Sequence, residues 1–191
     1  DLMKKTKPSH AYEAIKRNHA PGGMMSYESA DDLKFYVKKG YCPGNAGKTL
    51  EWAFQDWGLS RMALRMGKKS DAALYEKRSR AWTPLFNKNI GLILPKKENG
   101  EWLHTDPLNG QGWVEANAWQ ATWSVSHDLP KLVELMGGGD AFCEKLNYAF
   151  EQARPTDFVH AYSGGYVSYA NQPGCSNAHL FTYGGQPWLT Q

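Results

Sequence analysis

The segment from Asn45 to Lys68, NAGKTLEWAFQDWGLSRMALRMGK, has a long and clear helical period. Its apolar residues recur at helical intervals, and Gly67 is a plausible stop signal. A helix with a broad apolar stripe has to bury that stripe against other elements, and this need constrains the fold of the whole chain. The residues predicted to lie on the stripe are Leu50, Ala53, Phe54, Trp57, Met62, Leu64 and Met66.

A second helix is predicted soon after the first, in the sequence KSDAALYEKRSRAWTPLF that begins at Lys69. Ser70 or Asp71 is suited to cap its start, and Pro84 marks its disturbed end because proline lacks a backbone N–H. Two helices joined by a turn of about four residues form a hairpin. The residues predicted to face inward are Ala73, Leu74, Ser79 and Trp82.

The remainder of the chain mostly repeats this order of helix, turn and helix. The exception is GLILPKKENGEWLHTDPLNG (91–110), which fits either a strand pair with Asn-Gly at its turn or an elaborated loop. Residues 156–175 read as a long aromatic loop. Further helices are predicted over 115–125, 128–137, 140–152 and 176–188.

Short signals mark the ends of these later helices. Asp128 and Asp140 are predicted N-caps, and Gly184 with Gly185 is predicted to end the last helix. The helix over 140–152 is expected to turn inward Phe142, Leu146, Ala149 and Phe150.

The fold class predicted from this pattern is all-α, built of successive helical hairpins. Paired helices without an exact internal repeat fit a helical toroid better than a regular solenoid. With 191 residues, the chain is expected to form a single unit over residues 1–191.

Composition excludes some partners and leaves others open. The formal charge of +3 is spread along the chain, so we expect no nucleic-acid partner. No apolar run approaches the roughly eighteen residues of a membrane span, so we expect no membrane partner. Eight Trp, ten Tyr and a mean hydropathy of -0.61 suit a soluble protein with ring-lined clefts. Such rings suit both core packing and carbohydrate stacking, and packing is the commoner reason for any single ring.

The stretch GWVEANAWQATWSVSHDLP (112–130) places one glutamate among three tryptophans. If residues 115–124 are helical, Glu115 lies one turn from Trp119, and Trp123 follows at the same interval. Burial against apolar rings would favour the protonated carboxyl group, as a general acid requires. A glutamate in a first helical turn also interacts well with the helix dipole, so a structural role remains an alternative.

Glycoside hydrolysis usually needs a second carboxylate. The spacing of the available residues selects none of Asp56, Asp106, Asp128 and Asp157.

Four blocks resemble glycoside hydrolase family 92, the calcium-dependent exo-acting α-mannosidases. They are GYCP, TLEWAFQDWGLSRMALRMGK, VEANAWQATWSVSHDLPKLVELMGG and YANQPGCSNAHLFTYGGQPWLTQ, which occur in the order of the family and extend over most of the chain. The run E-x-N-A-W-Q, followed by H-D and then by G-Q-P-W-x-T-Q, makes the resemblance specific.

The resemblance implies an (α/α)6 toroid and an inverting mechanism, in which a glutamic acid protonates the departing oxygen and an aspartate activates water. Glu115 matches the acid, with Ala116 in place of the usual glycine. The implied substrate is an α-mannoside glycan, and the implied location is secreted, periplasmic or on the cell surface. The residues implied to contact substrate are Asn117, Trp119, Gln120, Tyr169, Asn171 and Gln172.

The sequence also departs from the family pattern. The base carboxylates of the family lie downstream of the T-Q at Gln191, and its N-terminal β-sandwich is absent, so we expect residues 1–191 to be the middle part of the catalytic domain. Such a part would expose apolar faces and associate with the missing parts of its own domain or with another copy. Activity is expected of the full-length protein and not of this part alone.

The calcium ion that the resemblance implies would take hard oxygen ligands, for which Asn171 and Gln172 are suitable in type. The family's N-E-P reads Asn171-Gln172-Pro173 here, so a neutral amide stands where a carboxylate is usual. Tyr169-Ala170 replaces the His-Glu of members that prefer α-1,2 linkages, so no linkage preference is carried over.

Two other functions remain open at this stage. The chain could be a carbohydrate-binding remnant that holds mannose on Trp and Tyr rings without hydrolysing it. It could also be a helical domain that presents surfaces to other proteins, in which case Glu115, Asn117, Gln120 and Gln172 would not gather around one cavity.

Overall fold

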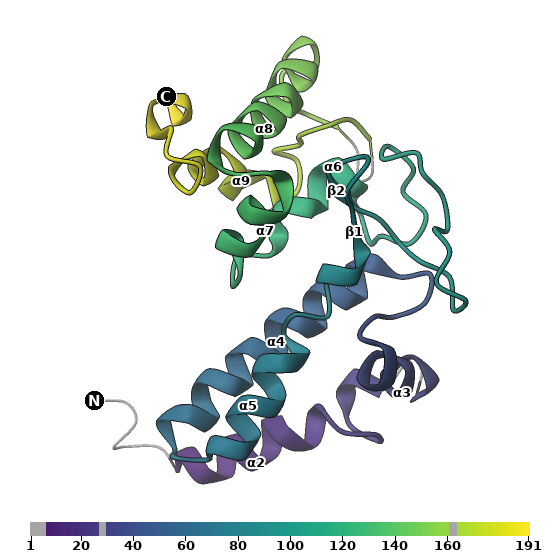
Figure 1. Cartoon of the computed structure of the whole chain (residues 1–191), viewed down its shortest axis with the longest axis vertical. Helices are drawn as coiled ribbons and strands as arrows, with labels where there is room; N and C mark the ends of the chain where they lie inside the picture. The colour runs from purple at the N-terminus through teal and green to yellow at the C-terminus, as the bar shows by residue number, and fades with distance from the viewer. Residues whose placement is uncertain (1–6, 27–29, 161–163) are drawn as a thin grey trace.

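The structure, a computed structural model, describes residues 7–26, 30–160 and 164–191. Helices α2 to α5 form one half of the molecule, and α6 to α9 form the other half (Figure 1). The α-helices are α2 (Pro8–Asn18), α3 (Ala30–Lys39), α4 (Ala46–Arg65), α5 (Lys69–Arg78), α6 (Ala118–Ala121), α7 (Leu129–Met136), α8 (Gly139–Ala153) and α9 (Gly174–Asn177). Single 3₁₀ turns occupy Met24–Ser26, Thr83–Leu85, Thr122–Ser124, Arg154–Thr156, Ala178–Thr182 and Pro187–Thr190.

Helices α4 and α5 form the predicted hairpin, with residues 66–68 as the turn. The side-chain oxygen of Asn45 caps α4 by accepting the backbone N–H of Lys48 at 2.8 Å. The predicted apolar stripe is only partly right. Leu50 and Ala53 are buried, but Phe54 and Leu64 are 45% and 54% exposed, because α2 and α5 pack against a neighbouring face of α4. The buried residues of α4 are Ala46, Thr49, Leu50, Trp52, Ala53, Asp56, Leu59, Ser60 and Ala63.

Helix α5 begins at Lys69, so the predicted caps at Ser70 and Asp71 are wrong. Asp71 instead accepts hydrogen bonds from the Tyr12 hydroxyl (2.5 Å) and the Lys16 ammonium (2.8 Å), which joins α5 to α2. The predicted inward residues are half right, since Ser79 and Trp82 are buried and Ala73 and Leu74 are exposed. The face of α5 that packs on α4 carries Ala72 and Tyr75.

A short antiparallel ladder follows, in which β1 (Phe86–Asn87) pairs with β2 (Leu92–Ile93). The predicted Asn-Gly turn exists, because the N–H of Gly100 bonds to the carbonyl of Lys97 at 3.0 Å. Its flanks share only one bridge, between Lys96 and Trp102. Residues 91–110 are therefore mostly an elaborated loop, whose first residues form β2 and pair with the preceding β1.

In the second half of the molecule, α7 and α8 occur close to the predicted positions, whereas the helix predicted over 115–125 is reduced to α6 and the 3₁₀ turn that follows it. Asp128 is at the N-cap position of α7 without a capping hydrogen bond, and α8 begins at Gly139, so Asp140 is not its cap. The last predicted helix consists of α9 and the 3₁₀ turn Ala178–Thr182. Of the residues that α8 was expected to turn inward, Phe142, Leu146 and Ala149 are buried and Phe150 is partly buried.

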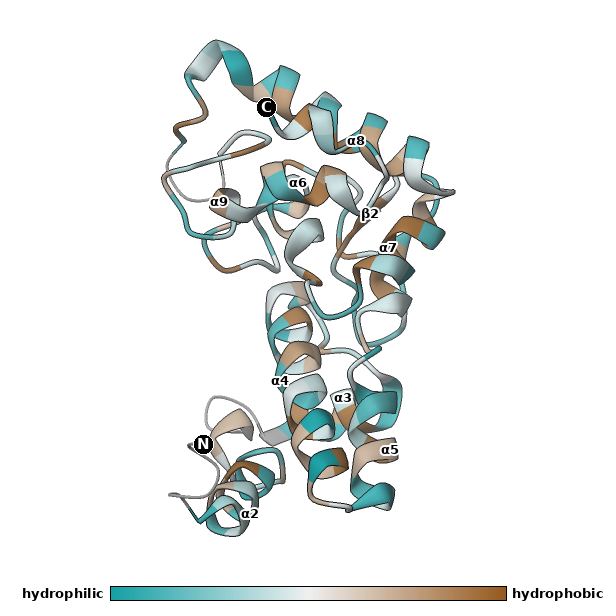
Figure 2. Cartoon of the chain, turned by 90° about the vertical axis from the view of Figure 1, so that its left-hand side faces the viewer, coloured by the Kyte–Doolittle hydropathy of each residue, from teal (hydrophilic) through white to brown (hydrophobic). Residues whose placement is uncertain are grey.

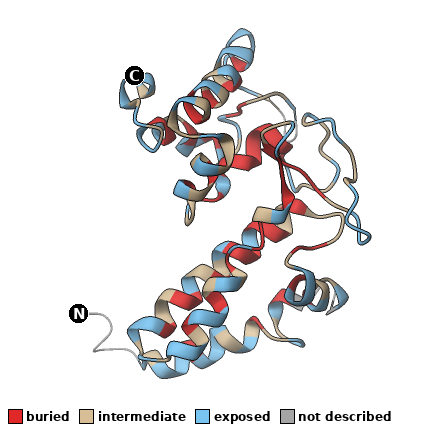
Figure 3. Ribbon diagram, in the orientation of Figure 1, coloured by how far each residue is buried: buried red, intermediate tan, exposed pale blue. Residues whose placement is uncertain are grey.

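The larger apolar core extends from α3 and α4 through β2 and α6 to α8. All residues of β1, β2 and α6 are buried and are drawn in red in Figure 3. Hydrophobic residues, brown in Figure 2, are present on α4, α6 and α7. Among the described residues, no helix combines the length and the apolar character of a membrane span.

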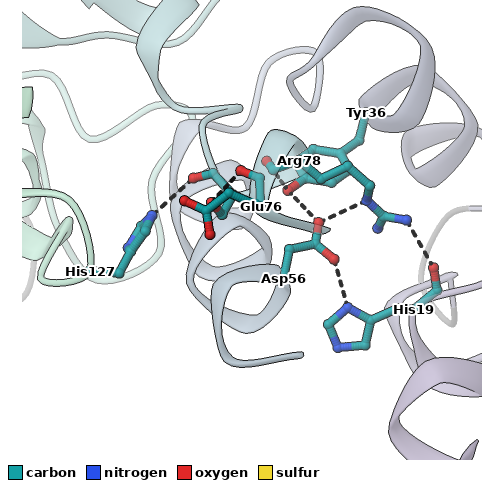
Figure 4. A network of polar contacts seen from close by, with 7 residues as sticks. His19, Tyr36, Asp56, Glu76, Arg78 and His127 are labelled. Atoms are coloured by element: carbon teal, nitrogen blue, oxygen red, sulfur yellow. Dashed lines mark hydrogen bonds and ion pairs between the residues drawn. The ribbon is translucent and has the colours of Figure 1, made fainter. Parts of the chain in front are cut away.

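The carboxylate of Asp56 is fully buried and connects three other helices of the first half (Figure 4). Its Oδ1 bonds to Nδ1 of His19, the C-cap residue of α2, at 2.8 Å. Its Oδ2 accepts the hydroxyl of Tyr36 on α3 at 2.9 Å and Nε of Arg78 on α5 at 2.8 Å. A charge taken out of water requires such compensation, so we interpret Asp56 as a structural carboxylate and not as the missing catalytic partner.

The imidazole of His127, drawn in Figure 4, joins the two halves by a 2.9 Å contact between its Nε2 and the carbonyl oxygen of Ser79. The rings of Phe54 and Trp57 lie beside it, with centroids 5.9 and 6.2 Å away. Burial lowers the pKa of His127, although Ser79, Asp128 and Glu76 partly oppose this shift.

We expect stability to fall as the pH decreases below about 6.5, because the unfolded chain binds a proton at His127 before the folded chain does. The free energy of unfolding should fall by up to about 1.4 kcal/mol for each unit by which folding lowers the pKa of His127. The measurement is the urea midpoint between pH 7.5 and 5.0 for the wild type and for His127→Gln, which should have the weaker pH dependence. His179→Gln, at an exposed position, is the matched control. Equal pH dependence in wild type and His127→Gln would contradict the expectation.

Candidate active site

Glu115 lies in a bend before α6. The predicted position in the first turn of this helix is therefore wrong. Helix α6 begins at Ala118, and the side-chain oxygen of its N-cap residue Asn117 accepts the N–H of Gln120 at 3.1 Å. The backbone of Glu115 has φ of +50°, a left-handed conformation that a helix does not contain. The side chain of Glu115 is exposed.

The tryptophans that were expected to cover Glu115 pack elsewhere. Trp123 is 2% exposed, stacks edge to face on Phe142 and donates from Nε1 to the carbonyl of Trp119 at 2.6 Å. Trp119 forms a cluster of three rings with Tyr148 and Tyr166, and the ammonium of Lys145 is 4.8 Å from its ring centroid. The predicted one-turn relation to Glu115 fails because it required both partners to be helical.

The amides of Asn117 and Gln120 bind the backbone of residues 164–173, here called the C-terminal loop, which precede α9. Nδ2 of Asn117 donates to the carbonyl of Gly165 at 2.8 Å. Nε2 of Gln120 donates to the carbonyl of Gly164. Both side chains are buried, so their position favours anchoring of this loop over direct contact with a ligand.

Asn171 is the predicted site residue that the structure brings to Glu115. Its Nδ2 donates to the backbone carbonyl of Glu115 at 3.0 Å, and its Oδ1 accepts the N–H of Gln172 at 3.0 Å. Gln172 itself is exposed. Tyr169 is 42% exposed and packs its ring on Phe158. Of the predicted residues, Asn171 contacts Glu115, whereas Asn117, Trp119 and Gln120 are buried and Tyr169 and Gln172 are exposed.

A cavity of about 340 Å³ lies beside the Glu115 bend. Both chain neighbours of Glu115, Val114 and Ala116, line it, as does Pro173 of the C-terminal loop. Phe54 and Trp113 contribute aromatic rings. Sequence reasoning had predicted Phe54 in the core and had not singled out Trp113, because no local pattern shows which face of α4 the bend covers.

The described residues do not fit a complete calcium site. Calcium takes six to eight oxygen ligands, usually with carboxylates among them. In the described ranges, no group of three or more His, Cys, Asp or Glu side chains has an arrangement that could hold a metal ion. Asn171 and Gln172 offer only neutral amide oxygens, and the amide oxygen of Asn171 already accepts a backbone N–H. The calcium predicted from the sequence therefore stays a prediction, and no catalytic step is derived from it.

Comparison with protein families matches residues 2–191 to the family described as the glycosyl hydrolase family 92 catalytic domain. Among curated proteins, an uncharacterized secreted glycosidase of Arthroderma benhamiae is 24% identical over 220 residues. The match covers 94% of this chain and 27% of that protein.

Solved structures give the same result. A family GH92 inverting mannosidase of Bacteroides thetaiotaomicron is 28% identical, with a TM-score of 0.79, over 96% of this chain and 28% of that one. A GH92 α-mannosidase of the same organism, solved in complex with mannoimidazole, is 22% identical with a TM-score of 0.81. This match covers 97% of this chain and 26% of the mannosidase chain, and at 22% identity it supports the fold alone. The chain thus spans about a quarter of the length of these relatives.

Proposed function

Since the chain belongs to glycosyl hydrolase family 92, we propose that it is part of an exo-acting α-mannosidase that cleaves α-mannosidic bonds of glycans with inversion. The helical hairpins are part of the (α/α)6 toroid that is the fold of this family. The observation that carries the proposal is the family match, which includes Glu115 and its whole block. That one solved relative is an inverting mannosidase supports both the substrate and the stereochemistry.

In this proposal Glu115 is the general acid. Its side chain is exposed, and both of its chain neighbours, Val114 and Ala116, line the adjacent cavity, which supports a substrate position close to Glu115. Protonation of that oxygen makes the departing sugar a neutral alcohol as the bond breaks. Inversion also needs a carboxylate that activates water on the opposite face of the sugar, and we assign that base to none of the described residues.

The adjoining cavity supports a sugar substrate. Phe54 and Trp113 present aromatic surface there, and Ser124 and Ser126 also line it. Apolar ring faces with a few hydroxyl partners suit the alternating C–H and O–H surface of a pyranose. We also propose that the protein acts outside the cytoplasm, which the description of the fungal relative as secreted supports.

The test is to incubate the full-length protein with α-mannobiose and to follow the anomeric protons by NMR. Inversion at an α-mannoside should give β-mannose first, with α-mannose appearing only as the product equilibrates. Release of α-mannose first would contradict the inverting mechanism. Binding of mannobiose without any release of mannose would contradict the enzyme and favour a carbohydrate-binding remnant.

A further inference from the structure

The backbone of Glu115 is held in a conformation that glutamate rarely adopts. Its φ of +50° lies in the left-handed region, which favours glycine because a side chain there meets the following carbonyl. Such a backbone persists only where surrounding contacts determine it. The contact made by the carbonyl of Glu115 is therefore informative.

That carbonyl accepts a hydrogen bond from Nδ2 of Asn171, a residue 56 positions further along the chain. The amide of Asn171 is fixed at both ends, because its Oδ1 accepts the N–H of Gln172. A flipped amide would set oxygen against the carbonyl of Glu115 and NH2 against the N–H of Gln172. The amide therefore has one favourable orientation, and that orientation supports the bend at Glu115.

The loop that carries Asn171 is itself anchored next to Glu115. Asn117, two residues after Glu115, donates to the carbonyl of Gly165, and Gln120 donates to the carbonyl of Gly164. The N–H of Ala118 bonds to the carbonyl of Pro107 at 3.1 Å. The chain on the C-terminal side of Glu115 is thus fixed, and Asn171 fixes the peptide of Glu115 itself.

We propose that Asn171 is a positioning residue for Glu115, an inference that rests on the proposed role of Glu115 as general acid. Asn171 acts on the backbone and sets the direction in which the carboxyl group leaves the chain. A general acid must lie within hydrogen-bond reach of the oxygen that it protonates. A rotation of the Glu115 peptide would move the carboxyl group and slow proton transfer. This role differs from the calcium or substrate contact that the sequence suggested for Asn171.

The experiment compares Asn171→Ala and Asn171→Asp with wild type in the full-length protein, using two substrates. α-Mannobiose has a poor leaving group that needs protonation, whereas dinitrophenyl α-mannoside has a good one that does not. We expect kcat on mannobiose to fall at least tenfold with KM nearly unchanged, and the rate on the aryl mannoside to change less than threefold. Asn99→Ala, which removes a similar side-chain bond to the N–H of Glu101, is the matched control.

Other patterns overturn the proposal. A higher KM on both substrates would make Asn171 a ligand of the sugar or of a metal. Equal losses on both substrates would make its role structural only. If Glu115→Gln acts selectively on mannobiose and neither Asn171 variant does, the positioning role is wrong while the proposed function stands.

If Glu115→Gln leaves the mannobiose rate unchanged, the proposed acid is wrong, and the backbone contact is tested separately. A crystal structure of the full-length Asn171→Ala variant reports φ at Glu115, which should leave the left-handed region. Retention of that conformation would show that Asn171 does not hold the bend.

Discussion

Replacing Glu115 by glutamine is expected to lower kcat of the full-length protein on α-mannobiose by about 10²- to 10⁴-fold, the usual contribution of general acid catalysis. Glutamine keeps the size of the side chain and one carbonyl oxygen, but its amide has no acidic proton to donate. The departing sugar would then leave as an alkoxide, which is a far poorer leaving group. Initial rates of mannose release measure the effect.

Two comparisons make this result specific. Dinitrophenyl α-mannoside, whose leaving group needs no proton, should lose much less rate in Glu115→Gln. Glu134→Gln, an exposed residue of α7 paired with Lys131, should behave as wild type on both substrates. Mannobiose hydrolysis at the wild-type rate by Glu115→Gln would remove Glu115 from the mechanism.

Replacing Asp56 by alanine is expected to lower the free energy of unfolding of the chain by about 3–5 kcal/mol, as for other buried ion pairs that lose one partner. The substitution leaves the Arg78 guanidinium with its buried charge uncompensated. It also removes the acceptor of the Tyr36 hydroxyl and the partner of His19. Urea unfolding followed by circular dichroism measures the loss.

The control is Asp31→Ala in α3. Asp31 also pairs with a cation, Lys34, at 3.0 Å, but its side chain is 91% exposed. Exposed pairs contribute about 0–1 kcal/mol, so this variant should unfold close to wild type. Similar losses for Asp56→Ala and Asp31→Ala would show that burial of Asp56 does not decide its contribution.

The sequence predicts the α4/α5 hairpin well because a long helical period is a strong local signal. It does not predict which residues of α4 are buried, since Phe54 and Leu64 are as apolar as Leu50 and only the packing partners distinguish them. The sequence also does not predict the structural role of Asp56, because that role depends on residues of three other helices.

The start of α6 was predicted wrongly although a signal was present. Asn117 and Gln120 have the spacing of an N-cap residue followed by the amide of a capping box, which places the helix start at Ala118 and leaves Glu115 outside. The contact between Asn171 and the Glu115 carbonyl could not be predicted in this way. It joins residues 56 positions apart, and local sequence preferences carry no information about contacts at that separation.

The shared bonding of Asp56 affects how the first half of the molecule opens. Residues from α2, α3 and α5 bond to the same carboxylate. If one of these helices detaches, the buried charge of Asp56 loses a hydrogen-bond partner. Opening of one helix is thereby coupled to opening of the others. We therefore expect helices α2 to α5 to open as one cooperative unit.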